Sequence, residues 1–193
     1  MKEIRLPPEA MTIENGVLIK YCGDCDSVDV PEGVTEIAEG AFFRKAHIKE
    51  ISLPQSLRKI GAYAFYGACG IANMSLPAGL CEIGEGAFER CYFREAVIPA
   101  GVVKIEKSAF AYNDNLRRAV LPEGLCEIEY AAFRCCRRLS DVNIPASVKR
   151  IGSYAFSACD ALADLRVPDG CETGMEFFEA PKWGKTAKKK KQK

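Results

Sequence analysis

This 193-residue sequence contains no long hydrophobic run and no apolar leader. No stretch of about 18 apolar residues occurs, so a membrane-spanning helix is not expected. The segment from Met1 to Pro8 lacks the apolar run of a secretory signal, which favours a cytoplasmic protein. The alternative is a cell-surface or secreted protein that is exported by a non-classical route.

Motifs of catalysis are also absent. The sequence has no G-x-G-x-x-G, no P-loop and no G-x-S-x-G, and it contains a single histidine, His47. Carboxylates such as Glu36 and Glu39 fall at positions expected to be exposed turns, where solvation accounts for them. We predict that the chain is not an enzyme, with no catalytic residue, no cofactor and no metal site.

The main part of the chain is also not basic, although binding to nucleic acid would require positive charge there. The net charge is +1, but from Lys182 onward there are seven lysines and no acids. Residues 1–181 therefore carry 20 basic and 26 acidic groups, a net of −6. No specific nucleic-acid partner is expected, because phosphate binding needs clustered positive charge. The lysine-rich end is either a solubilising tail or a contact for acidic protein, nucleic acid or anionic membrane.

What the sequence does contain is a repeat of about 23 residues. Three markers follow this period: a proline that begins a turn, an isoleucine six residues later, and a phenylalanine after an alanine. Consecutive prolines are 23 residues apart except for one spacing of 22, and chance does not produce three such series. The prolines are Pro31, Pro54, Pro77, Pro99, Pro122, Pro145 and Pro168. The phenylalanines are Phe42, Phe65, Phe88, Phe110, Phe133 and Phe156.

Each unit predicts one coil of a solenoid. The alternating segment Ile51-Ser52-Leu53 suits a short strand, and Pro54 ends it because proline has no N–H for the ladder. Leu57 and Ile60 begin the return side, and Phe65 fills the interior. One coil cannot bury its apolar face alone, so each is stabilised by the next. The predicted fold is a β-rich repeat solenoid with a parallel strand ladder and little regular helix.

The ends of the array are predicted to be caps. The segment Asn15–Tyr21 suits a strand after a tight turn. After Pro168 the pattern decays: Gly174 falls where the isoleucine belongs, and Phe177 and Phe178 are expected to cover the last coil. We predict an N-terminal cap, a solenoid of six to seven repeats, and a cap remnant with a disordered lysine-rich tail, at 1–21, 22–175 and 176–193.

The unit at residues 48–65, IKEISLPQSLRKIGAYAF, resembles the leucine-rich repeat of the BspA-like (Treponema-type) family. The opening NGVLIKY at residues 15–21 is similar to the start of many members. The resemblance covers about residues 12–175. It implies a right-handed leucine-rich-repeat superhelix with a parallel strand ladder. It also implies adhesion or protein-binding roles, often at surfaces of bacteria or parasitic protists.

Several of the ten cysteines recur with the repeat. Cys91, Cys136 and Cys159 follow the repeat phenylalanine by three residues and Cys69 by four, which predicts small buried side chains. A disulfide between Cys81 and Cys126 is not expected, because two coils separate them.

Two close cysteine pairs raise the alternative of a thiol-based metal or redox protein: Cys22 with Cys25, and Cys135 with Cys136. Zinc usually needs a second pair of ligands. We prefer the interpretation that one cysteine of each pair lies in the core and the other on the surface, with Cys25 in a core slot and Cys22 in a loop.

The outward side of the strand ladder is the candidate partner-binding site. Its centre is apolar at Val97 and Val120 and its ends are polar, which suits a protein interface; a plain solvated sheet face is the competing interpretation. A protein partner, or host matrix or carbohydrate for an adhesin, would dock there, and the chain would be a monomer or associate weakly end to end. Arg94 and Arg117 add positive charge beside the ladder. The outward residues are Glu50, Ser52, Asn73, Ser75, Glu95, Val97, Arg118, Val120, Asp141, Asn143, Asp164 and Arg166.

Overall fold

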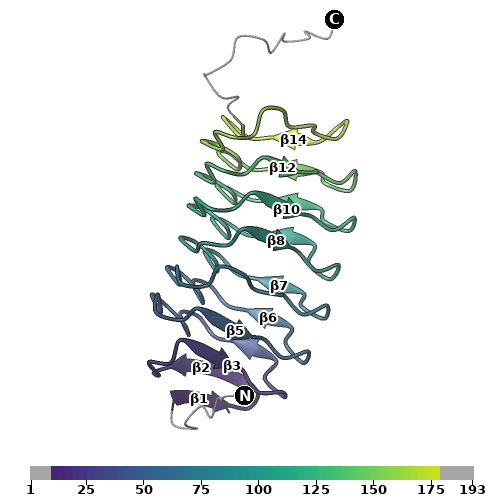
Figure 1. The fold of residues 1–193 in the computed structure, drawn as a ribbon. Coiled ribbons are helices and arrows are strands. Elements are labelled where there is room, and N and C mark those ends of the chain that lie inside the picture. Colours follow the sequence, from purple (N-terminus) through teal and green to yellow (C-terminus); the bar gives the residue numbers. More distant parts are fainter. Residues whose placement is uncertain (1–9, 179–193) are drawn as a thin grey trace, which may run out of the picture.

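The computed structural model describes residues 10–178, which form a solenoid of stacked coils (Figure 1). All fourteen regular elements of this part are short strands. No helix of the described residues is long and apolar enough to cross a membrane. The predicted repeat solenoid with parallel ladders is confirmed. The predicted lysine-rich tail lies outside the described residues.

The first ladder comes from the segments that precede the repeat prolines. Its strands are parallel and in register, so that Glu95, Arg118 and Asp141 lie side by side on successive coils. Short strands form here because apolar residues alternate with polar ones and proline ends each run. The strands are β3 (Ser27–Asp29), β5 (Glu50–Ser52), β8 (Glu95–Val97), β10 (Arg118–Val120) and β12 (Asp141–Val142).

The second ladder runs through the repeat isoleucines, which are all buried. Its parallel strands form two sheets, which meet between β7 and β9 where the spacing of the repeat falls to 22. The strands are β2 (Val17–Tyr21), β4 (Glu36–Ile37), β6 (Lys59–Ile60) and β7 (Glu82–Ile83), then β9 (Lys104–Ile105), β11 (Glu127–Ile128), β13 (Arg150–Ile151) and β14 (Glu172–Thr173).

The third side of each coil consists of turns around the repeat phenylalanine. The N–H of Phe65 donates to the Ala87 carbonyl of the next coil at 2.8 Å, and other coils repeat this bond. The residues two before and two after each phenylalanine adopt positive φ, as Tyr63 (53°) and Gly67 (69°) do around Phe65. Most of these positions are not glycine, so the coils hold ordinary side chains in a conformation that costs about 1–2 kcal/mol per residue.

This conformation predicts that Ala158→Gly stabilises the protein. Ala158 is half-buried with φ of 56°, and glycine adopts that φ without a Cβ clash. The free energy of unfolding should rise by about 0.5–1 kcal/mol after the entropy of the freer unfolded chain is subtracted. Ala161→Gly, at an exposed position without positive φ, should instead lower it. Urea unfolding of both variants checks the difference in sign, and destabilisation by both would contradict this explanation.

The core is a column of aromatic rings along the solenoid axis. Tyr21 and the six repeat phenylalanines are at most 1% exposed, and consecutive ring centroids lie 4.9–5.4 Å apart in stacked orientation. The spacing matches the distance of about 4.8 Å between neighbouring strands, so one ring fits each coil. Each ring is therefore covered by the rings of the coils before and after it.

Both ends carry cap structures. Strand β1 (Met11–Glu14) pairs antiparallel with β2 through a tight turn in which Asn15 and Gly16 have positive φ. This turn suits Asn-Gly, because both central residues of such a hairpin need that conformation. At the other end Phe178 forms a bridge with Phe156, and Phe177 and Phe178 pack half-buried against the core as expected.

The prediction for Gly174 is wrong by one residue. Thr173, not Gly174, pairs with Ile151, and the Gly174 N–H donates to the Ile151 carbonyl at 2.8 Å. The reason is that the segment between Cys171 and Thr173 is one residue shorter than the corresponding segment between Val148 and Ile151.

Candidate protein-binding face

The outward residues of the first ladder lie on one side of the solenoid, which we name the ladder face. It consists of the twelve outward residues given above, from Glu50 to Arg166, with Arg117 beside them. Eleven of the twelve, and Arg117, are exposed, and Val120 is half-buried. Asn73, Ser75, Asp164 and Arg166 lie on coils without a strand here, and Asn143 lies just past β12. The structure thus places the predicted residues on neighbouring coils of one face.

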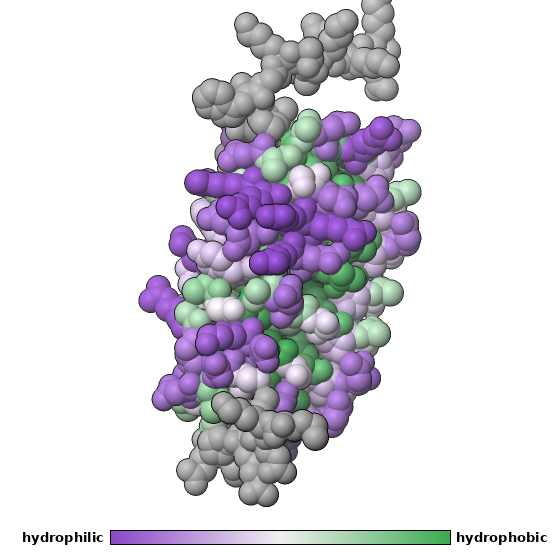
Figure 2. Space-filling model, viewed as in Figure 1, coloured by the Kyte–Doolittle hydropathy of each residue, from purple (hydrophilic) through white to green (hydrophobic). Residues whose placement is uncertain are grey.

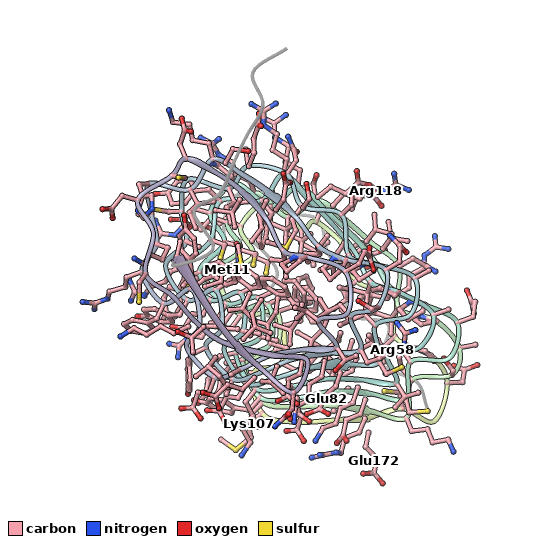
Figure 3. All side chains as sticks on the ribbon, turned by 90° about the horizontal axis from the view of Figure 1, so that it is seen from below. Met11, Arg58, Glu82, Lys107, Arg118 and Glu172 are labelled. Carbon is pink, nitrogen blue, oxygen red and sulfur yellow. The ribbon has the colours of Figure 1, made fainter. Side chains whose placement is uncertain are left out.

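The upper part of the ladder face is an ionic row. Arg118 Nη1 lies 3.2 Å from Glu95 Oε1, and its Nε lies 3.1 Å from Asp141 Oδ2. All three side chains are roughly half exposed or more, so each pair contributes little to folding stability. Figure 3 shows Arg118 pointing outward, on a different side of the solenoid from Glu82 and Glu172. The row therefore consists of paired charges that remain accessible to solvent.

The middle of the ladder face is apolar and hollowed. Val97 is 54% exposed, and it lies at the edge of a shallow groove of about 1040 Å³. Ile51, Leu53, Met74 and Leu76 form much of the apolar lining of the groove. In Figure 2 apolar residues gather over the middle coils, with hydrophilic residues above and below them. An apolar centre inside a polar rim is the arrangement found in protein interfaces.

The side chains that project from the second ladder form a second row, which the sequence interpretation missed. Acids and bases alternate along it, and Lys59 lies 3.5 Å from both Glu36 and Glu82. The charges of Glu82 and then Glu36 raise the pKa of the Lys59 ammonium. The expectation that Glu36 lies in a solvated turn is wrong, because Glu36 belongs to strand β4. The series is Glu36, Lys59, Glu82, Lys104, Glu127, Arg150 and Glu172.

This second row is largely occupied by its own partners. Lys104 Nζ lies 3.0 Å from Glu129 Oε1, a contact that is the largest cause of the raised pKa of Lys104. Arg150 pairs with both Glu127 and Glu129, and Glu129 is among the few buried charged residues. A partner that docked on this side would have to replace these ion pairs. The ladder face, with its apolar centre, is the better candidate.

The cysteines are divided between core and surface. Cys91, Cys136 and Cys159 are fully buried, as expected, and each thiol donates to the carbonyl of a phenylalanine in another coil at 3.1–3.2 Å. Asn113 occupies the same slot in its coil and donates to the Phe88 carbonyl at 2.8 Å, which was not foreseen. The prediction for Cys69 is wrong, because Ala68 fills the slot and Cys69 is exposed.

The two cysteine pairs are placed in different ways. Cys22 is exposed as expected, but Cys25 is only half-buried, although its repeat position corresponds to that of the buried Ile48. Cys135 is half-buried, and burial raises the pKa of the adjacent Cys136 thiol well above its usual range. A protonated buried thiol is a poor nucleophile. No group of three metal-binding side chains occurs in residues 10–178.

Comparison with known proteins gives a consistent result. The family described as the BspA type Leucine rich repeat region matches residues 1–93 and 81–180 in six copies. A leucine-rich repeat protein of T. pallidum is 31% identical, with a TM-score of 0.84, 90% of this chain covered and 87% of that chain. A leucine-rich repeat protein of Bacteroides ovatus is 32% identical with a TM-score of 0.74 over 77% of this chain. This chain spans 39% of that protein's length. Comparison with curated protein sequences gave no match.

Proposed function

The chain belongs to the BspA-type leucine-rich repeat family, and we propose that it is a non-enzymatic module that binds a protein through its ladder face. Leucine-rich repeat proteins generally act in protein interactions. The observation that carries the proposal is Val97, an apolar side chain left 54% exposed beside the groove in the middle of a face with a polar rim. Burial of such a group against a partner removes apolar surface from water.

The other sides of the solenoid offer less to a partner. The second ladder has its charges already paired. The turn side exposes aromatic rings that are covered in part by their own neighbours: Phe43 stacks on Tyr66 at 5.0 Å, and Arg44 lies over the Phe43 ring. Solenoids use extended ladder surfaces for binding, and the first ladder combines a groove with an apolar centre.

Val97→Asp tests the proposal, with Val103→Asp as the matched control. Val103 is 56% exposed, but it directly precedes β9 of the second ladder. A protein captured by immobilised wild type from the source cell would be purified and titrated against each variant by calorimetry. We expect Val97→Asp to weaken binding by about tenfold or more, because a charge would be buried in an apolar interface, and Val103→Asp to leave the affinity unchanged. Equal affinities for the two variants would show that the partner docks elsewhere.

A further inference from the structure

The first ladder is interrupted at one coil. Strands β3 and β5 form one sheet, β8, β10 and β12 form another, and residues 71–77 between them have no strand. Among the described residues, no hydrogen bond is made by the backbone of Asn73, Met74, Ser75 or Leu76. Backbone N–H and C=O groups require partners, so these four residues must obtain theirs from solvent or from a ligand. They line the groove described above.

The strands on either side also turn free backbone groups toward this coil. Residues of a paired strand direct their N–H and C=O alternately to the two sides. The Glu50 N–H donates to Asp26, and the Ser52 carbonyl accepts from Val30, so both residues face β3 and Ile51 faces the interrupted coil. On β8 the Ile98 N–H donates to Val120, so Val97 faces the same coil from the opposite side.

An extended chain fits this geometry. Residues 71–77 lie between β5 and β8 without forming a strand with either, so the backbone groups that β5 and β8 direct toward this coil stay unpaired beside the groove. A chain laid over residues 73–76 would find backbone donors and acceptors on the floor and on both rims. Its side chains would contact the apolar floor at Ile51, Leu53 and Met74, while its backbone hydrogen-bonds to the unpaired groups around them.

The charge of the groove indicates what such a chain carries. Asp29, Glu50 and Glu95 are among its lining residues, and no lysine or arginine is. Glu95 is paired with Arg118, whereas no ion pair of the described residues involves Asp29 or Glu50. Register places Asp29 opposite Ser52 on β5, so Asp29 and Glu50 lie on adjacent strands of one face. Two accessible carboxylates favour a cationic ligand.

We propose that this groove binds an extended polypeptide segment of the partner through its unpaired backbone groups, with lysine or arginine side chains held by Asp29 and Glu50. This rests on the protein-binding function proposed above and specifies the chemistry of the partner. The segment would alternate apolar residues, which face the floor, with basic residues directed toward the acidic rim.

The test uses the full chain and two synthetic peptides with blocked ends, Thr-Lys-Val-Lys-Val-Thr and a version with glutamate in place of both lysines. Affinities would be measured by NMR titration. We expect the lysine peptide to shift and protect the amides of Ile51, Leu53 and Val97. Asp29→Asn with Glu50→Gln should weaken its binding by about fivefold. Asp160→Asn with Asp169→Asn removes the same charge at exposed positions that lie outside the ladder face and four or more coils away from Glu50, and it should change nothing.

Equal binding of the glutamate peptide, equal weakening by the two double variants, or shifts located outside the groove would overturn the proposal. Tighter binding after removal of residues 182–193 would show that the chain's own lysine-rich end occupies the groove, which would overturn the assignment to a partner. If the lysine peptide does not bind while Val97→Asp still weakens binding of the captured protein, this inference falls and the protein-binding function stands. If the peptide binds at the groove and Val97→Asp leaves the affinity for the captured protein unchanged, the groove inference stands and the proposed binding of that protein through Val97 falls.

Discussion

Replacement of Phe110 by alanine is expected to lower the free energy of unfolding by about 3–5 kcal/mol. Phe110 is 1% exposed and stacks between the rings of Phe88 and Phe133, at 5.3 and 5.4 Å. Loss of this ring opens a cavity at the centre of the column and removes the cover of both neighbouring coils. Because each coil is stabilised by the next, the halves on either side should also unfold less cooperatively.

Phe43→Ala is the matched control for this prediction. Phe43 is 45% exposed and has one ring neighbour, Tyr66, so its loss should cost no more than about 1.5 kcal/mol. Urea unfolding followed by circular dichroism gives both values. A difference between the two variants below the error of the measurement would contradict the assignment of the ring column as the core.

The second large effect is expected at alkaline pH. Burial raises the pKa of the Cys159 thiol to about 12 and raises the pKa values of Cys91 and Cys136 as well, from a usual value of 9. Above pH 9 the unfolded chain releases these protons while the folded chain retains them. The stability that these thiols contribute is therefore fully present below pH 9 and is lost as the pH rises toward their folded pKa values. Each thiol should contribute a loss of about 1.4 kcal/mol per pH unit.

The variant with alanine at Cys91, Cys136 and Cys159 is the control. Alanine is tolerated in this slot, because Ala68 occupies it in another coil. The variant should be less stable than wild type at pH 7, since three thiol hydrogen bonds are lost. Between pH 9 and 10, however, its free energy of unfolding should fall by about 3 kcal/mol less than that of wild type under reducing conditions. Parallel pH profiles would mean that the thiols are not protonated in the fold.

Much of the fold follows directly from the repeat. Proline, isoleucine and phenylalanine each mark one side of a coil, and side-chain periodicity then determines which residues face inward. The positive φ around Phe65 was not predictable in this way, because residues as different as Tyr63, Ser108 and Ala131 adopt it. The packing of neighbouring coils imposes that conformation against the preference of the individual residues.

The candidate site was predicted only in part. Outward exposure of Val97 follows from alternation, and the structure agrees. The alternating charges from Glu36 to Glu172 were present in the sequence one residue before each repeat isoleucine or its equivalent, and comparison of that position between units would have found them. The interruption at Asn73–Leu76 could not be predicted, since those residues fit the repeat. The same coil is one residue shorter than the others, and the missing residue lies between Phe88 and Phe93, just before β8.

The footprint of a bound partner on the chain would show whether the ladder face is the binding surface. Hydrogen exchange would be measured for the backbone amides of the free protein and of its complex with the protein captured from the source cell. We expect slowed exchange at residues 50–53, 73–76 and 95–98 and unchanged exchange in the turns around the repeat phenylalanines. Protection confined to those turns or to the second ladder, with the amides of the ladder face unaffected, would contradict the claim that this face binds the partner.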